Sequence, residues 1–378
     1  MGADRGGMHM RAPDPDAGRI APRTGGRRVA PLDGVRGIAI LAVLAFHFVY
    51  EAAPGGAFGV DLFFVLSAFL ITGILVREYD ATARMDMAAF YVRRAARLLP
   101  ALALFLLVIA PPIAFVIGTV EGIPLSSLAV ALYVADFGRA GYFPFTDPYG
   151  HTWSLAVEEQ FYLVWPIALL LVLKSRIKLV PLGVALFVGG ALVTWAGSVW
   201  LGIGPNYFLP TGHLPAFGAG ALAAFIALRL SDAAIARVSS SPLAIAGVVG
   251  LALVFVLPRA DWPLWAQNIA PLPVLLLAGC LILHAASGRR SLVNSGLSMA
   301  WLRWFGTRSY GIYLYHAAFY ELFSNEYLPV GRILNSFLGL AVSLIVAEVS
   351  YRYVEQPIIR RGRQWSQRRR EREAGKPS

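Results

Sequence analysis

Residues 56–76 read GAFGVDLFFVLSAFLITGILV, a run of 21 residues in which Asp61 is the only charged side chain. An α-helix rises about 1.5 Å per residue, so a run of this length crosses the hydrocarbon core of a bilayer. Nine further segments have the same character. Together they give ten predicted spans: 34–53, 56–76, 101–118, 154–173, 179–201, 214–230, 242–257, 267–286, 304–324 and 331–354. We therefore predict an all-α integral membrane protein of about ten transmembrane helices.

The composition of the 378-residue chain agrees with this fold class. Hydrophobic residues make up 57% of the chain, charged residues make up 15%, and the mean hydropathy is +0.61. Soluble domains are about 25% charged, and a soluble enzyme of this size could not bury so much apolar surface. The single cysteine, Cys280, excludes an internal disulfide framework and a multi-cysteine metal site. We expect no metal and no bound cofactor.

The basic residues orient the spans. The net charge is +11, and with the N-terminus in the cytoplasm only Arg139, Arg259 and Arg332 fall in outer segments, which leaves 30 of the 33 Lys and Arg on the cytoplasmic side. This asymmetry follows the positive-inside rule. It predicts a multi-pass protein of the cytoplasmic membrane with both termini inside, and it explains the charge without nucleic-acid binding.

The ends of the chain differ in composition from its middle. We expect a disordered basic tail at 1–30, a membrane domain at 31–357 and a basic cytoplasmic tail at 358–378, with Pro357 ending the last membrane helix. Because the second tail is short, we expect the chemistry to be completed within the membrane domain or passed to a separate protein.

Several polar residues are predicted inside spans, where they usually face a bundle interior. His47 lies roughly 16 Å beyond Arg36 along the first span. Asp61 and the pair Glu158 and Glu159 begin the second and fourth spans, at a similar predicted depth. A carboxylate beside an imidazole fixes its tautomer and stabilises the imidazolium that forms when a hydroxyl proton is taken. The pattern indicates His47 as a general base assisted by Asp61 or Glu158. Alternatively, His47 only hydrogen-bonds a backbone carbonyl of a neighbouring helix.

A second cluster lies on the cytoplasmic side, in the sequence FYVRRAARLLP at 90–100. Arg93 and Arg94 each share a helix face with Arg97. Clustered guanidinium groups suit phosphate recognition, although they also anchor helices to anionic lipid. Arg36 on the same side of the membrane favours the phosphate site.

Six motifs in sequence order resemble acyltransferase family 3, whose members are membrane proteins. They are PLDGVRGIA at 31–39 with His47 beyond it, GVDLFFVLSAFLIT at 59–72, the arginine-rich stretch ending at Pro100, TWSLAVEEQFY at 152–162, SYGIYLYH at 309–316 and VEQP at 354–357. The resemblance covers about residues 30–360. One departure is Ala68, where many members have glycine after the serine.

The resemblance implies transfer of an acyl group, often acetyl, from cytoplasmic acyl-CoA as co-substrate to a hydroxyl of a carbohydrate or glycosylated product. The family's arginine and histidine of the first span correspond to Arg36 and His47. By resemblance, Arg36 and the arginine cluster bind the donor phosphates, and His47 is the general base or a transient acyl carrier. We expect four further residues to line the donor and acceptor sites, although the last of them also suits a Tyr–His hydrogen-bond layer: Ser67, Glu159, Tyr162 and His316.

Two other classes of protein fit the same composition. A transporter or flippase of a glycan or lipid-linked substrate would show broken spans and charges at the midplane. A non-catalytic membrane sensor or scaffold would keep the motifs without the chemistry. Binding of acyl-CoA distinguishes the acyltransferase from both.

Overall fold

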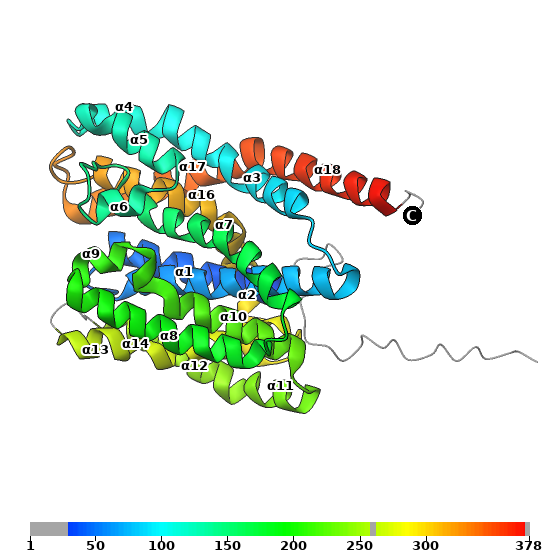
Figure 1. The fold of residues 1–378 in the computed structure, drawn as a ribbon. Helices are drawn as coiled ribbons and strands as arrows, with labels where there is room; N and C mark the ends of the chain where they lie inside the picture. The colour runs from blue at the N-terminus through cyan, green and yellow to red at the C-terminus, as the bar shows by residue number, and fades with distance from the viewer. Residues whose placement is uncertain (1–28, 258–261, 375–378) are drawn as a thin grey trace, which may run out of the picture.

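The structure, a computed structural model, describes residues 29–257 and 262–374, and within these ranges the regular elements are helices without strands (Figure 1). Nine helical segments of this part of the chain are long and apolar enough to cross a membrane. The prediction of an all-α, multi-pass membrane protein is confirmed. The N-terminal tail predicted at 1–30 lies almost wholly outside the described residues.

The longer helices run mostly along one common direction in Figure 1. They are α1 (Ala30–Phe48), α2 (Gly59–Thr82), α3 (Met87–Leu104) with its continuation α4 (Ala110–Val116), α7 (Trp153–Lys174), α8 (Leu179–Trp200), α10 (Leu214–Arg229), α12 (Ser241–Val256), α14 (Pro271–Ala286), α16 (Ala300–Leu322), α17 (Arg332–Ser350) and α18 (Gln356–Ala374). Shorter helices connect them: α5 (Ile123–Ala131), α6 (Ala135–Arg139), α9 (Ile203–Phe208), α11 (Asp232–Val238), α13 (Leu264–Ile269) and α15 (Leu292–Leu297).

Helix α16 explains why nine apolar spans are found where ten were predicted. It is 23 residues long and packs along α1 and α17, but its sequence is too polar to count among the nine. A Cβ atom at Gly306 would overlap the carbonyl oxygen of Asp33 in α1. The two helices therefore approach closely because this position is glycine, and much of the polarity of α16 faces protein instead of lipid.

Two predicted helix ends are wrong. The predicted span 101–118 is the second half of one continuous helical segment, Met87–Val116, which contains Pro100 and a π-helical turn at Phe105–Ile109. The predicted stop at Pro357 also fails, because α17 continues through a π-helical turn at Tyr351–Glu355 into α18. Proline lacks an N–H group, and here it follows a turn in which the hydrogen-bond ladder already changes register.

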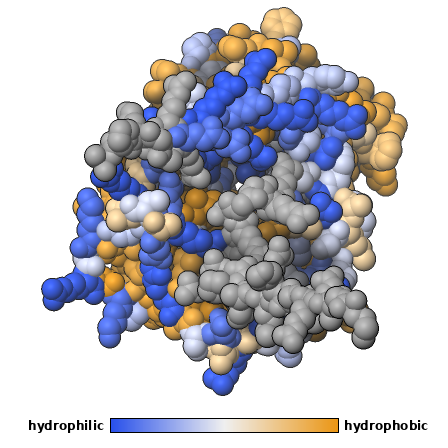
Figure 2. Space-filling view, turned by 90° about the vertical axis from the view of Figure 1, so that its right-hand side faces the viewer, coloured by the Kyte–Doolittle hydropathy of each residue, from blue (hydrophilic) through white to orange (hydrophobic). Residues whose placement is uncertain are grey.

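Helix α18 consequently turns most of the predicted basic tail into a packed element. It lies beside α3 in Figure 1, and a Cβ atom at Gly362 would come within 2.6 Å of the Ala96 side chain. Hydrophilic side chains gather over this end of the bundle (Figure 2). By the positive-inside rule this is the cytoplasmic end.

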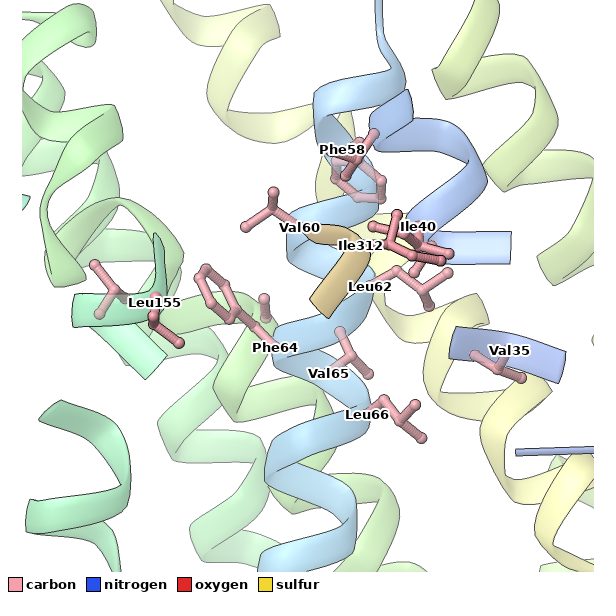
Figure 3. Close-up of a cluster of buried hydrophobic side chains, with 14 of the residues drawn as sticks. Val35, Ile40, Phe58, Val60, Leu62, Phe64, Val65, Leu66, Leu155 and Ile312 are labelled. Carbon is pink, nitrogen blue, oxygen red and sulfur yellow. The ribbon is translucent and has the colours of Figure 1, made fainter. Parts of the chain in front are cut away.

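Helix α2 runs through the middle of the hydrophobic core. Leu62, Phe64, Val65 and Leu66 are at most 1% exposed and point to several sides of the helix, toward α1, α7 and α16 (Figure 3). Burial on all sides explains why residues 56–76 are almost continuously apolar. Two of the polar exceptions, Asp61 and Ser67, lie where α2 borders two cavities, and the third, Thr72, accepts a hydrogen bond from Trp165.

Candidate active site

A cavity of about 430 Å³ opens among α1, α2, α3, α7, α16 and α18; we call it the arginine cavity. It is lined along α2 from Val60 to Ile74, roughly 21 Å of helix. Arginines from three helices line it: Arg36, Arg93, Arg94, Arg97 and Arg363. Ser154 of α7 and Tyr313 of α16 line the end of the cavity nearest Val60. This end lies within the bundle, and we call it the inner end.

The arginines differ in what holds them. Arg36 donates to Asp33 at 3.0 Å, one turn earlier in α1. Arg94 pairs with Glu159 at 2.5 Å. Arg97 is exposed and makes no hydrogen bond or ion pair with any residue that the structure describes. Arg363 is likewise exposed and unpaired among the described residues, so the guanidinium groups of Arg97 and Arg363 are the most available to an anionic ligand.

Four of the five site residues predicted from α2 and α7 meet at this cavity: Ser67, Glu158 and Tyr162 line it, and Glu159 pairs with the lining Arg94. Glu158 accepts hydrogen bonds from Ser67 at 2.5 Å and from the hydroxyl of Tyr162. The guanidinium of Arg94, held by Glu159, lies 3.1 Å from the centre of the Tyr162 ring. This network joins α2, α3 and α7 and holds in place the part of the cavity wall that these residues form.

His47 stands on the same face of α1 as Arg36, three turns further along. Its Nδ1–H donates to the carbonyl oxygen of Val43 at 2.9 Å, so in the neutral ring Nε2 carries the lone pair. The alternative prediction, a hydrogen bond to a backbone carbonyl of a neighbouring helix, is wrong in its partner, because the acceptor Val43 lies one turn earlier in α1 itself. Nε2 remains available as a base.

The expected pairing of His47 with Asp61 or Glu158 is absent among the described residues. Asp61 is hydrogen-bonded to Nδ1 of His213 at 2.7 Å instead, and Glu158 belongs to the network in the cavity wall. The predicted depth of Asp61 is wrong because α2 begins beside the middle of α1: a Cβ at Gly59 would overlap the carbonyl oxygen of Ala39.

Two other histidines surround His47. The ring centres of His47 and His316 are 4.7 Å apart, and those of His316 and His151 are 5.4 Å apart. His316 Nδ1–H donates to the Tyr313 carbonyl at 2.6 Å, and His151 Nε2–H donates to the Leu314 carbonyl at 2.9 Å. Their second nitrogens are buried without a hydrogen-bond partner in the described chain. We call His47, His151 and His316 the histidine cluster.

Tyr313 connects the histidine cluster to the arginine cavity. Its hydroxyl donates to the His151 carbonyl oxygen at 3.0 Å and lies 2.5 Å from the Ser154 hydroxyl. Ser154 and Tyr313 line the inner end of the cavity. A chain of polar groups thus leads from the arginines to His47.

Three contributors were missed by the sequence reasoning. Arg363 was assigned to a tail because Pro357 was expected to end the helix. Tyr313 and Ser154 stood in the quoted motifs without a role. The spacing of Ser309, Tyr313, His316 and Tyr320, which places them on one helical face, is the signal that could have found the polar stripe of α16.

The fold and the site together define a multi-pass membrane protein with an internal, strongly cationic cavity. The family model described as "Acyltransferase domain" matches residues 29–352. The chain therefore belongs to acyltransferase family 3, as the motifs predicted.

Named relatives agree with this family. The chain is 32% identical over 355 residues to the peptidoglycan O-acetyltransferase OatA of Listeria monocytogenes, a match covering 88% of this chain and 56% of the relative. It is 30% identical over 352 residues to the O-acetyltransferase OatA of Staphylococcus aureus, covering 89% of this chain and 58% of the relative. The chain thus spans little more than half the length of these relatives. No solved structure matches it.

Proposed function

We propose that this chain is a membrane-bound O-acetyltransferase that moves an acetyl group from cytoplasmic acyl-CoA to a hydroxyl of a cell-envelope carbohydrate of the peptidoglycan class. Membership of acyltransferase family 3 and the names of the two relatives support the reaction and the acceptor class. In this proposal the arginine cavity holds the donor and His47 is the general base.

The charge gradient of the arginine cavity is the observation that carries the proposal. Arg97 and Arg363 are at the cationic end, whereas Val60, Leu155 and Phe64 form an apolar wall toward the inner end. Phosphates are too costly to transfer into an apolar interior, so they stay among the guanidinium groups. The slender arm of acyl-CoA, which ends in the thioester, fits the apolar part of the arginine cavity.

The reaction places defined demands on His47. Its Nε2 takes the proton of the acceptor hydroxyl, the oxygen attacks the thioester carbon, the carbon–sulfur bond breaks, and the proton passes to the leaving thiolate. The hydrogen bond to Val43 holds the ring in the tautomer that this step needs. His316, at 4.7 Å between ring centres, is the nearest polar ring. In the other version of the mechanism Nε2 carries the acyl group between donor and acceptor.

The test is release of free CoA by the purified full chain in lipid nanodiscs, with acetyl-CoA and candidate glycans, for wild type and His47→Ala. We expect glycan-dependent CoA release by wild type, loss of release in the variant, and acetyl-CoA binding by both. Equal turnover of the two proteins would remove His47 from the chemistry. Absence of acetyl-CoA binding in wild type would refute the acyltransferase assignment. Acid-quenched wild type bearing labelled acetyl on His47 would select the acyl-carrier version.

A further inference from the structure

A second cavity, of about 360 Å³, lies at the opposite end of the bundle from α18. It is formed by the end of α1, the 3₁₀ turn Gly56–Phe58, α8, α9, α10, α13 and α14, and we call it the polar cavity. α9 and α13 lie far from α18 in Figure 1. By the positive-inside rule the cavity faces the outer side of the membrane. We propose that it binds a neutral sugar ring of the acceptor glycan.

One wall of the polar cavity is a connected network of amides and hydroxyls. Asn206, 1% exposed, donates to Ser198 at 3.1 Å and to the carbonyl oxygen of Thr194 at 3.0 Å. Ser198 in turn donates to Asn268 at 3.1 Å. These groups hydrogen-bond to one another, so their polar atoms are held in fixed positions. A site for hydroxyl ligands requires such fixed hydrogen-bonding atoms.

The floor of the cavity is a carboxylate. Oδ1 of Asp61 is hydrogen-bonded to His213 Nδ1, and the opposite nitrogen of His213 donates to the Tyr207 carbonyl at 2.7 Å. His213 is thereby held between two oxygens and orients Asp61. The second carboxylate oxygen, Oδ2, has no hydrogen-bond partner within the described ranges, and Asp61 lines the cavity. A ligand hydroxyl is the natural donor to such an oxygen.

The charge of the lining selects the ligand class. Among the residues that the structure describes, Asp61 is the only acidic residue that lines the polar cavity, and neither lysine nor arginine lines it, in contrast to the arginine cavity. Asp61 already pairs with His213, so a phosphate or carboxylate ligand would face this carboxylate with no unpaired cation among the described lining residues. Aromatic side chains form the remaining wall: Phe46, Tyr50, Phe58 and Tyr207. Aromatic faces beside amides and a carboxylate match a sugar ring, which offers C–H faces and hydroxyl edges.

The polar cavity adjoins the proposed catalytic machinery. Phe64 separates the two cavities: it lines the arginine cavity, and its ring is 5.0 Å from the ring of His213. Phe46 lines the polar cavity, and its ring is 5.1 Å from that of His47. Calling the bound sugar the acceptor rests on the proposed function, whereas binding of a sugar in this cavity does not.

The test measures binding of a β-1,4-linked N-acetylglucosamine tetramer to the full chain in nanodiscs by saturation-transfer NMR and titration. Ala57→Phe fills the cavity from the 3₁₀ turn. Val188→Phe adds a comparable side chain at a lipid-facing position of α8 that is 50% exposed. We expect at least tenfold weaker tetramer binding by Ala57→Phe and wild-type affinity for Val188→Phe. An unfolding temperature equal to that of wild type reports that each variant is folded, whether or not the chain binds acetyl-CoA.

If Ala57→Phe does not fold, Tyr50→Ala at the cavity mouth replaces it, and the same loss of tetramer binding is expected. Equal tetramer affinity in wild type and in the folded cavity variant, or no tetramer binding by wild type, would overturn the proposal. Displacement of the tetramer by inorganic phosphate would overturn the neutral-ligand assignment. Tetramer binding in the cavity without any CoA release would support the sugar site while contradicting the proposed function, so the two can fail separately.

Discussion

Replacing Arg97 with glutamine is expected to weaken acetyl-CoA binding by about 10- to 150-fold. Arg97 projects into the arginine cavity and pairs with none of the described residues, so its removal leaves no protein group without a partner. The substitution therefore removes a contact to the ligand only, and the expected loss is in the affinity for acetyl-CoA. A hydrogen bond to a charged group contributes about 1.5–3 kcal/mol, and about 1.4 kcal/mol is tenfold in affinity.

The assay is titration of acetyl-CoA and of acetylpantetheine into the protein in nanodiscs. Acetylpantetheine has the thioester arm but lacks the diphosphate and nucleotide, so its affinity should be the same for wild type and Arg97→Gln. Arg84→Gln is the matched control, because Arg84 is exposed in the loop after α2 and does not line the cavity. Arg94→Gln would be a poorer test, since it also strips Glu159 of its ion-pair partner.

Three results would refute this reasoning. Unchanged acetyl-CoA affinity in Arg97→Gln would show that the phosphates do not reach Arg97. An equal loss for acetylpantetheine would show that the substitution distorts the cavity without removing a phosphate contact. A similar loss in Arg84→Gln would show that the general charge of the cytoplasmic face attracts the donor, an effect that rising salt would also weaken.

Three further predictions concern the fold and the histidine cluster. Burial raises the pKa of Asp136 in α6 to about 6, against the opposing hydrogen bond from Gln160. The ordinary pKa of an aspartate is 3.8, so the unfolded chain releases the Asp136 proton at a lower pH than the folded protein does. The free energy of unfolding should therefore fall by up to about 3 kcal/mol as the pH rises from 4 past 6. Thermal unfolding of Asp136→Asn should lose that pH slope, and an unchanged slope would contradict the assignment. Gly306→Ala should separate α1 from α16, lower the free energy of unfolding by about 1–3 kcal/mol and reduce CoA release. The control Gly73→Ala, whose added Cβ meets open space, should leave the stability of the protein unchanged. Equal unfolding temperatures for the two variants would contradict the close approach of α1 and α16. His316→Ala should slow CoA release by about 100-fold while acetyl-CoA binding is retained, and added imidazole should restore part of the rate. If imidazole restores none of the rate, the role of His316 is structural.

The fold class and the family could be read from the sequence because both depend on local signals. Runs of about 20 apolar residues can only be satisfied by helices in a bilayer, since a helix pairs its own backbone groups. The asymmetry of the basic residues predicts the orientation. The clustering of Arg93, Arg94 and Arg97 was also predictable, because residues three and four apart share a helix face, and the structure places all three in one cavity.

The tertiary structure decided which polar groups meet. Helix depth was estimated from the sequence as if each span began at the membrane surface, but α2 begins beside the middle of α1, so Asp61 joins His213 and not His47. The chain continues through the π-helical turn at Tyr351–Glu355 into α18, and this continuation places Arg363 at the arginine cavity. The spacing of residues along one helix determines which of them share a face. The partners across helices depend on how deeply each helix sits and on where glycines such as Gly306 allow close approach, which no single span encodes.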